Sequence, residues 1–278
     1  MKLIHITDTH LVEPGGLLYG LDPRERLDAC IADINQQHGD AELCVITGDL
    51  THWGEAAAYE NLKHSLATLT VPVVPLLGNH DDRPTFREYF PDAPADPDGF
   101  IQGVQDVSAG RFLYLDTNLD GTHAGWYCDK RFAWLERQLT EADGSTPLYL
   151  FMHHPPFEIG MPSLDSIGLA QADDFAKLVE PHRVKIRHLF FGHVHRPISG
   201  SWLGIPVSTL RATNHQCWLD FRDVEHPLGS HEPPAYAVVL IDDRAVVVHS
   251  HDYLDRSAKF DMGAQTEAER EMSTRLVS

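Results

Sequence analysis

Cysteine is scarce in this 278-residue sequence, and its scarcity excludes some kinds of site. The four cysteines, Cys30, Cys44, Cys128 and Cys217, are scattered, and none belongs to a CxxC pair. A Cys-rich structural zinc site is therefore not expected. Two of the four lie in apolar periodic segments, where cysteine usually acts as a small hydrophobic residue. We expect buried free thiols.

Long apolar runs and basic residues are also in short supply. No uncharged apolar stretch is long enough to cross a bilayer. The opening MKLIHITDTH is too short for a signal-peptide core and is interrupted by Asp8, so we expect a cytoplasmic protein with no membrane partner. The 22 basic residues against 41 acidic ones give a formal net charge of −19, which opposes binding to a nucleic-acid polymer. An anionic substrate would need a local positive centre.

Five short apolar runs predict β-strands. They lack polar alternation, which is typical of strands buried on both faces in a largely parallel sheet. The runs are 3–6, 43–46, 71–77, 148–152 and 188–191.

Helical spacing of apolar residues between these runs predicts helices, and strand followed by helix, repeated, indicates an α/β fold. The first helix should begin after Asp22, with Pro23 at its first position. The predicted apolar stripes are Leu27/Ile31/Ile34, Tyr59/Leu62/Leu66/Leu69, Phe132/Leu135/Leu139 and Ala172/Phe175/Val179. The stretches 100–107 and 111–117 predict a hairpin, so the sheets should be mixed.

Side chains that can bind a metal follow each of the five predicted strands. They are Asp8-Thr9-His10, Gly48-Asp49, Gly78-Asn79-His80-Asp81, His153-His154-Pro155 and Gly192-His193-Val194-His195. Ligands of open α/β sheets bind where the carboxyl ends of strands converge, so one crevice can collect all five. Oxygen and imidazole donors without thiolate suit Fe, Mn, Zn, Co or Ni. Seven donors are too many for one tetrahedral ion, whereas two ions about 3.5–4 Å apart would use them all.

Each motif alone has an ordinary explanation. GNHD is compatible with an Asx-type turn, HHPP with a loop of solvated histidines, and GHVH with an exposed strand end. Five such motifs at the ends of five apolar runs favour a dinuclear metal site over five independent coincidences.

The residues in and around the five motifs resemble those of a known family. ITDTH, ITGDL, LLGNHDD, FMHHPP and FGHVHRP resemble the calcineurin-like metallophosphoesterase superfamily, in the branch of class III cyclic-nucleotide phosphodiesterases and bacterial glycerophosphodiesterases. The resemblance implies an α/β fold, a four-layer αββα sandwich of two mixed β-sheets flanked by helices. It also implies a catalytic domain over 1–216. We expect residues 217–256 to add C-terminal strands with a lid or dimerisation insertion, and 257–278 to form a tail.

The resemblance also implies a role for each motif residue. Two divalent or trivalent ions (Fe, Mn, Zn or Co) would be held, with Asp49 bridging them. The implied ligands are Asp8, His10, Asp49 and His195 for one ion, and Asp49, Asn79, His153 and His193 for the other. His80 would be the catalytic residue, stabilising phosphoryl charge or protonating the leaving alkoxide; the alternative is a hydrogen bond that orients Asn79. Implied substrate contacts are His10, Asn79, His80, His195 and His215.

The implied reaction is hydrolysis of a small phosphodiester by hydroxide formed from metal-bound water. Where phosphoprotein phosphatases of the superfamily carry arginines, this chain has GDLTHWGE and LGNHDD, which disfavours a phosphoprotein monoester. The expected substrates are 3′,5′-cyclic AMP and glycerophosphodiesters. The alternatives are a promiscuous phosphonate monoesterase or phosphomonoesterase, a pyrophosphohydrolase, and a non-catalytic scaffold. We expect a homo-oligomer.

Several other aromatic and histidine side chains have alternative roles. Tyr19, Trp53, Trp126 and Phe157 are candidate walls for the substrate, with simple packing as the alternative. The histidines expected to serve packing or strand structure instead of ligation are His5, His154, His188, His249 and His251.

Overall fold

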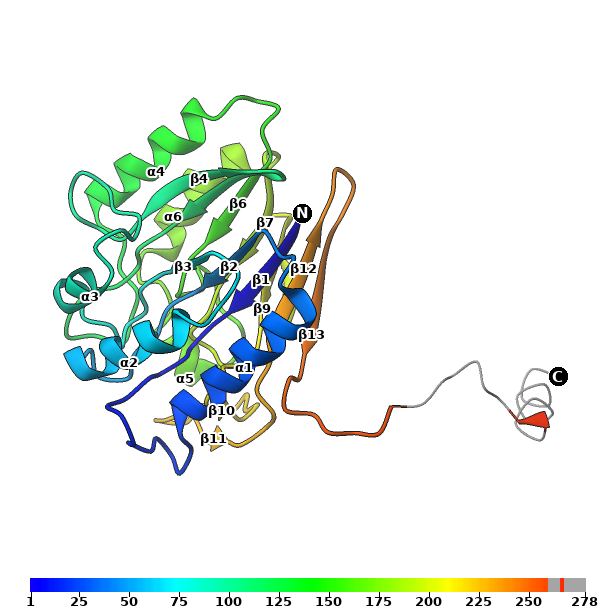
Figure 1. The fold of residues 1–278 in the computed structure, drawn as a ribbon. Helices are drawn as coiled ribbons and strands as arrows, with labels where there is room; N and C mark the ends of the chain where they lie inside the picture. Colours follow the sequence, from blue (N-terminus) through cyan, green and yellow to red (C-terminus); the bar gives the residue numbers. More distant parts are fainter. Residues whose placement is uncertain (260–265, 268–278) are drawn as a thin grey trace.

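The computed structural model describes residues 1–259, 266 and 267, and its core is two sheets that pack face to face (Figure 1). The first sheet has the strand order β13-β12-β1-β2-β3, and the second has the order β4-β5-β6-β7-β9-β8. The strands of the first sheet are β1 (Lys2–Ile6), β2 (Leu43–Ile46), β3 (Val73–Pro75), β12 (Tyr236–Ile241) and β13 (Val246–His251). Those of the second are β4 (Gly103–Val107), β5 (Gly110–Tyr114), β6 (Leu148–Phe151), β7 (Ile186–Phe190), β8 (Ile198–Trp202) and β9 (Ile205–Thr209).

Both sheets are mixed. Strands β1, β2 and β3 run parallel, β12 pairs antiparallel with β1, and β13 pairs antiparallel with β12 at the edge. Strands β5, β6, β7 and β9 run parallel, with β4 and β8 antiparallel at the edges. The predicted hairpin is β4–β5.

Helices cover the outer face of each sheet. They are α1 (Pro23–His38), α2 (Ala56–Leu66), α3 (Arg83–Tyr89), α4 (Asp129–Glu141), α5 (Pro162–Asp165), α6 (Ala172–Val179) and the 3₁₀ helix η1 (Glu180–His182). One core cluster joins α1, α2 and α3 to the first sheet, and another joins α4 and α6 to the second. The predicted αββα sandwich is confirmed.

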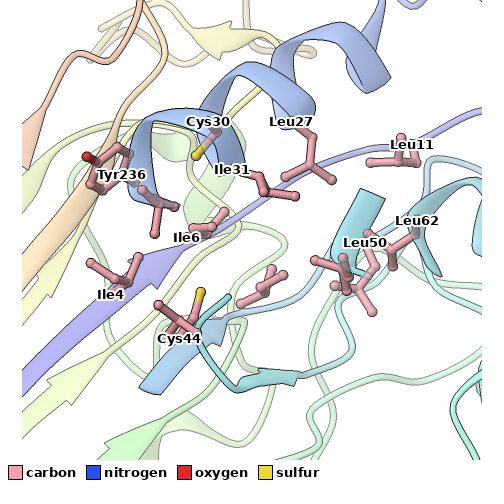
Figure 2. Packing of buried hydrophobic residues seen from close by; sticks show 14 of the residues in the cluster. Ile4, Ile6, Leu11, Leu27, Cys30, Ile31, Cys44, Leu50, Leu62 and Tyr236 are labelled. Carbon is pink, nitrogen blue, oxygen red and sulfur yellow. The ribbon is translucent and has the colours of Figure 1, made fainter. Parts of the chain in front are cut away.

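The apolar runs lack polar alternation because both faces of each strand are covered. In β1, Leu3 points between the sheets, whereas Ile4 packs beneath α1 with Leu27 and Ile31 (Figure 2). In β6, Tyr149 faces the other sheet. Successive side chains of a strand point to opposite faces, so burial of both faces requires an apolar residue at nearly every position.

Three local predictions need correction. Leu69 lies beyond the end of α2, so the second apolar stripe is shorter than expected. The run 71–77 forms only the three-residue β3, since it carries two prolines and proline cannot donate to a strand ladder. Helix α3 was not predicted, although Asp82 caps it by accepting a hydrogen bond from the backbone N–H of Thr85.

The segment after residue 197 serves both sheets. It extends the second sheet with β8 and β9 and completes the first with β12 and β13. Between them, β10 (Gln216–Cys217) and β11 (Gly229–Ser230) form a separate small hairpin in the segment expected to be a lid. Its role in capping or dimerisation, like the three-part division of the chain, stays a prediction. Most of the expected tail 257–278 lies outside the described residues.

The cysteines are all free, but only Cys30 and Cys44 are buried; Cys128 and Cys217 are partly exposed, contrary to the expectation for them. Cys128 lies at the start of α4 and Cys217 in the small β10–β11 hairpin, and neither position is inside one of the two large sheets. In the described part of the chain, no helix is both long enough and apolar enough to cross a membrane.

Candidate metal centre

The loops that leave β1, β2, β3, β6 and β7 meet at one end of the sandwich. These five strands are parallel within their sheets, so their carboxyl ends fall on the same side. The structure brings together all the predicted site residues: Asp8, His10, Asp49, Asn79, His80, His153, His193, His195 and His215.

The first predicted ligand set forms one tight group. The ligand atoms of Asp8, His10, Asp49 and His195 all lie within 4.8 Å of one another, and all four residues are buried. His195 Nε2 lies 3.4 Å from Asp8 Oδ1, and His10 Nε2 lies 3.5 Å from Asp49 Oδ2. Two carboxylates and two imidazoles at this spacing can surround a single cation.

The second predicted set adjoins the first through Asp49. His153 Nε2 lies 3.4 Å from Asp49 Oδ2 and 3.1 Å from Asn79 Oδ1. His193 Nδ1 lies 3.0 Å from the same amide oxygen of Asn79. The Oδ2 atom of Asp49 is therefore close to an imidazole of each set, which is the position that a bridging carboxylate needs.

The protonation of His153 tests whether these donors fit a cation. Its Nδ1 lies 2.7 Å from the carbonyl oxygen of Thr47, which can only accept, so Nδ1 carries the proton. In the neutral ring, Nε2 then directs a lone pair at the oxygens of Asn79 and Asp49. Only a proton or a metal ion between these atoms removes the repulsion. Burial alone would lower the pKa of His153, but the Asp49 carboxylate raises it to about 9.

His195 is arranged in the same way. Its Nδ1 donates to the carbonyl oxygen of His215 at 2.7 Å, so its Nε2 faces Asp8 and the Nε2 of His10. Burial opposes a charge on this ring as well, yet the Asp8 carboxylate raises the pKa of His195. Two imidazoles that direct Nε2 toward two buried carboxylates fit a metal centre.

The backbone at the predicted ligands is unusual. Seven non-glycine residues among those described have a positive φ, and five of them are predicted ligands: Asp8, His10, Asp49, His193 and His195. This left-handed conformation costs on the order of 1–3 kcal/mol per residue and is typical of functional sites. The strain turns side chains at successive strand ends into one crevice.

A buried carboxylate holds two of the loops together. Asp81 accepts hydrogen bonds from the backbone N–H groups of Leu50, Thr51 and Gly78. Burial, followed by the charge of Asp49, raises the pKa of Asp81 to about 6. Asp81 thus ties the loop that carries Asp49 to the loop after β3.

His80 lies at the edge of the group and is half-buried. Its backbone N–H donates to Asp49 Oδ1 at 2.9 Å, and its Nδ1 lies 2.8 Å from the carbonyl oxygen of His52. This leaves Nε2 as the nitrogen that can face a substrate. Among the described residues the side chain of Asn79 bonds His123, His153 and His193, so the alternative role of His80 in orienting Asn79 has no hydrogen bond to support it.

Two histidines at the site were not predicted. The Nδ1 atom of His52 lies 3.0 Å from Nδ1 of His10, and its ring stacks on that of His80 with centroids 4.6 Å apart. His123 accepts a hydrogen bond at Nδ1 from the side-chain amide of Asn79, 2.9 Å away. His52 follows Asp49 by three residues, and His123 lies in the loop after β5. Both histidines therefore lie in loops that follow the carboxyl end of a strand, as the predicted ligands do.

Other histidines lie where packing was expected. His154 is buried, with Nδ1 2.7 Å from the Thr117 hydroxyl and Nε2 3.2 Å from the carbonyl oxygen of His123. Both of its nitrogens therefore have partners in the protein. His5 and His188 are buried and contact Phe190 between the sheets.

Of the four candidate aromatic walls, two adjoin the site. The ring of Tyr19 lies 4.6 Å from that of His215, and the ring of Trp53 lies 4.6 Å from that of His52. Phe157 packs on Phe191 and Trp202 in the outer core, so its assignment as a wall is wrong. Trp126 lines a different cavity, with Tyr127, Cys128, Asp129, Phe132, Gln171 and Asp174.

A cavity of about 480 Å³ adjoins the site through His215. It is lined by Tyr19, His215, Gln216, Cys217, Pro227, Leu228, Gly229, Ser230 and His231. The ring of His215 lies 4.6 Å from that of His195. A molecule bound at the ligand cluster can therefore extend into this cavity.

Comparison with known proteins identifies the family. The family model for calcineurin-like phosphoesterases matches residues 1–197. The chain belongs to this family. It is 44% identical over 256 residues to a probable cyclic nucleotide phosphodiesterase of Rhodopseudomonas palustris, covering 91% of this chain and 93% of the relative. It is 33% identical to a glycerophosphodiester phosphodiesterase of Enterobacter lignolyticus, covering 78% of each chain.

Solved structures agree at the level of the fold. This calcineurin-like phosphoesterase superposes on a purple acid phosphatase from yellow lupin seeds with a TM-score of 0.67 and 14% identity, covering 93% of this chain and 52% of the phosphatase. It also superposes on Plasmodium GAP50, described as the anchor in the inner membrane complex, with a TM-score of 0.63 and 12% identity, covering 94% and 87%. The fold thus serves an enzyme and an anchor, so function has to be argued from the site.

Proposed function

We propose that this calcineurin-like phosphoesterase hydrolyses small phosphodiesters with the help of two metal ions. The proposed ligands are those predicted from the motifs, with Asp8, His10, Asp49 and His195 around one ion and Asp49, Asn79, His153 and His193 around the other. The observation that carries the proposal is the position of Asp49 Oδ2, 3.5 Å from His10 Nε2 and 3.4 Å from His153 Nε2. Fe, Mn, Zn and Co all match the donors.

When bound, two such cations would neutralise the phosphodiester and acidify a water for attack on phosphorus. The chain supplies the rest of the chemistry. His80 keeps Nε2 free because its Nδ1 donates to the His52 carbonyl. In the doubly protonated ring Nε2 also carries a proton, and from the edge of the site this Nε2–H can stabilise charge on a phosphoryl oxygen or pass its proton to the leaving alkoxide.

The arginines next to the motifs favour a diester over a monoester. Arg83, three residues after His80, makes a bidentate contact with Asp116. Arg196, directly after His195, binds Glu232 and the carbonyl oxygen of Cys217. Neither is available to clamp the extra charge of a phosphomonoester, whereas a diester carries only one negative charge.

The adjoining cavity would hold one ester arm. Its walls include the rings of Tyr19 and His215, and two of its polar side chains already have partners: Gln216 bonds the backbone of Ala212, and Ser230 bonds Glu232. A pocket of this kind accepts a flat or apolar arm without reading a specific hydrogen-bond pattern. A nucleoside therefore fits better than glycerol, and we place cyclic nucleotides such as 3′,5′-cyclic AMP before glycerophosphodiesters.

The remaining sequence expectations belong to this proposal. A cytoplasmic location, a homo-oligomer and the absence of a nucleic-acid substrate fit a hydrolase of small anions. Trp218, Leu219 and Phe221, on the segment between β10 and β11, are exposed, and these side chains support an oligomeric contact.

The deciding experiment combines metal analysis with hydrolysis assays. Protein stripped by a chelator and reconstituted with Fe, Mn, Zn or Co should bind two ions and hydrolyse bis(p-nitrophenyl) phosphate faster than p-nitrophenyl phosphate. Cyclic AMP and glycerophosphoethanolamine would then rank the substrates. A protein that binds no metal and turns over none of these compounds would be the scaffold alternative. Faster hydrolysis of the monoester would instead indicate a phosphomonoesterase.

A further inference from the structure

A line of hydrogen bonds runs from the space between the sheets to the predicted ligand Asp8. His5 Nε2 lies 2.9 Å from the hydroxyl of Thr47, which lies 2.9 Å from the hydroxyl of Thr7, which in turn lies 2.6 Å from Asp8 Oδ2. All four residues are buried, with at most 1% of any of them exposed. The line is therefore shielded from solvent.

The direction of each hydrogen bond is dictated from the carboxylate end. A carboxylate only accepts, so the single proton of the Thr7 hydroxyl goes to Asp8. Thr7 must then accept from Thr47, and Thr47 must accept from a protonated Nε2 of His5. His5 Nδ1 has no hydrogen-bond partner among the described residues, which agrees with this single tautomer. Burial, followed by His188, lowers the pKa of His5 to about 3, so the ring is neutral at physiological pH.

The line determines how Asp8 faces the site. Its Oδ2 is held by Thr7, while its Oδ1 accepts from the backbone N–H of His193 at 3.1 Å and lies 3.4 Å from His195 Nε2. Oδ1 is thus the oxygen presented to the metal centre. We infer that His5, Thr47 and Thr7 are positioning residues that orient Asp8 as a one-oxygen ligand and so set the affinity of the ion it holds. The inference rests on the proposed function.

Gly192 shows that the space around this line is specific. A Cβ atom at this position would overlap the Thr7 hydroxyl and come within 2.7 Å of the Thr47 carbonyl oxygen. The glycine of the GHVH motif therefore leaves room for the hydroxyl that orients Asp8. Gly192 therefore packs the GHVH motif against the strand end that carries Thr7 and Asp8. This contact between the two motifs does not depend on a metal ion.

The same interior contains a matched control. His188 is also buried between the sheets, its Nε2 lies 2.8 Å from the Ser208 hydroxyl, and its Nδ1 also lacks a partner among the described residues. Among the described residues, the Ser208 hydroxyl makes no further side-chain hydrogen bond toward the metal centre. Loss of the Ser208 hydroxyl thus removes a similar buried hydrogen bond without reaching a ligand.

The test titrates Mn²⁺ or Zn²⁺ into chelator-stripped full-length protein and follows binding by calorimetry, with thermal unfolding measured in parallel. Thr7→Val keeps the shape of the side chain but removes the donor to Asp8, and we expect it to lower the affinity for one of the two ions about 10- to 100-fold. Thr47→Val should lower the affinity for the same ion by a smaller factor. Thr7→Ser should restore affinity, and Ser208→Ala should bind both ions as the wild type does.

A second variant separates positioning from simple loss of stability. His5→Leu/Thr47→Val removes both partners of one buried hydrogen bond, so its stability should recover relative to Thr47→Val alone. The affinity for the affected ion should stay reduced. Recovery of affinity together with stability would overturn the inference, as would equal Mn²⁺ affinity in Thr7→Val and Ser208→Ala. Absence of metal binding by the wild type would overturn the proposed function and the inference with it.

Discussion

The Nε2 atoms of His10 and His195 lie 3.0 Å apart, although His195 already donates its Nδ1 proton to a carbonyl group. Two such nitrogens repel one another unless a proton or a metal ion lies between them. Because the pair is buried beside the carboxylates of Asp8 and Asp49, a cation is the partner that this geometry favours. If a cation normally lies between these nitrogens, the metal-free protein should depend on protons at the site, and its stability should change with pH.

Metal-free protein should lose stability as the pH rises from about 6.5 to 8.5. The pKa of His153 is raised to about 9 in the folded state, so its proton stabilises the fold fully below the unfolded value of 6.5. That contribution disappears as the pH approaches 9. One pKa unit is about 1.4 kcal/mol, and each kcal/mol shifts Tm by about 2–4 °C in a protein of this size. Thermal unfolding with a chelator present should show Tm falling by several degrees over this pH range. The fall in Tm should be smaller for the metal-loaded protein. A constant or rising Tm would contradict the assignment.

Asn79→Ala should lower the affinity for one ion more than the affinity for the other. The Asn79 amide oxygen lies 3.1 Å from His153 Nε2 and 3.0 Å from His193 Nδ1, both of which belong to the second proposed set. We expect roughly a 10- to 100-fold loss of affinity for that ion, as is typical when a metal site loses a supporting group. Metal content after dialysis against graded chelator would measure it. Equal loss of both ions would mean that the two sets have been divided wrongly.

His80→Ala should lower kcat for bis(p-nitrophenyl) phosphate about 10²- to 10⁴-fold, the usual contribution of general acid catalysis. Both ions should be retained, because the side chain of His80 is not a proposed ligand. His64→Ala is a suitable control, since His64 is exposed on α2 and, among the described residues, its side chain bonds only the Glu60 carbonyl oxygen. An unchanged turnover rate in His80→Ala would remove its catalytic assignment.

Tyr19→Ala should raise KM for cyclic AMP and bis(p-nitrophenyl) phosphate about tenfold, with a smaller change for glycerophosphoethanolamine. The reason is that the Tyr19 ring forms a wall of the cavity proposed to hold an aromatic arm, and losing such a contact typically costs about 1–3 kcal/mol. Trp126→Ala, at an exposed ring beside another cavity, should leave all three KM values unchanged. An equal effect of Tyr19→Ala on all three substrates would place the arm elsewhere.

Much of the candidate site was predictable because most of its side chains lie just after the carboxyl ends of predicted strands. Asp8, Asp49 and His153 come directly after apolar runs, and parallel strands place such residues at the same edge. His123 and His52 were missed because neither belongs to a motif of its own. Phe157 packs on Phe191 and Trp202, and the sequence pattern does not specify this direction of its side chain.

The sequence by itself determined most of the strand and helix order, the family and the candidate donors, since these depend on local periodicity and on residues at strand ends. Only the tertiary structure decided that Asp49 Oδ2 lies between His10 and His153, that the β10–β11 hairpin forms a cavity beside His215, and that Thr7 orients Asp8. Those facts depend on how two sheets pack against each other. Packing joins residues far apart in the chain, at distances that no pattern within one strand specifies.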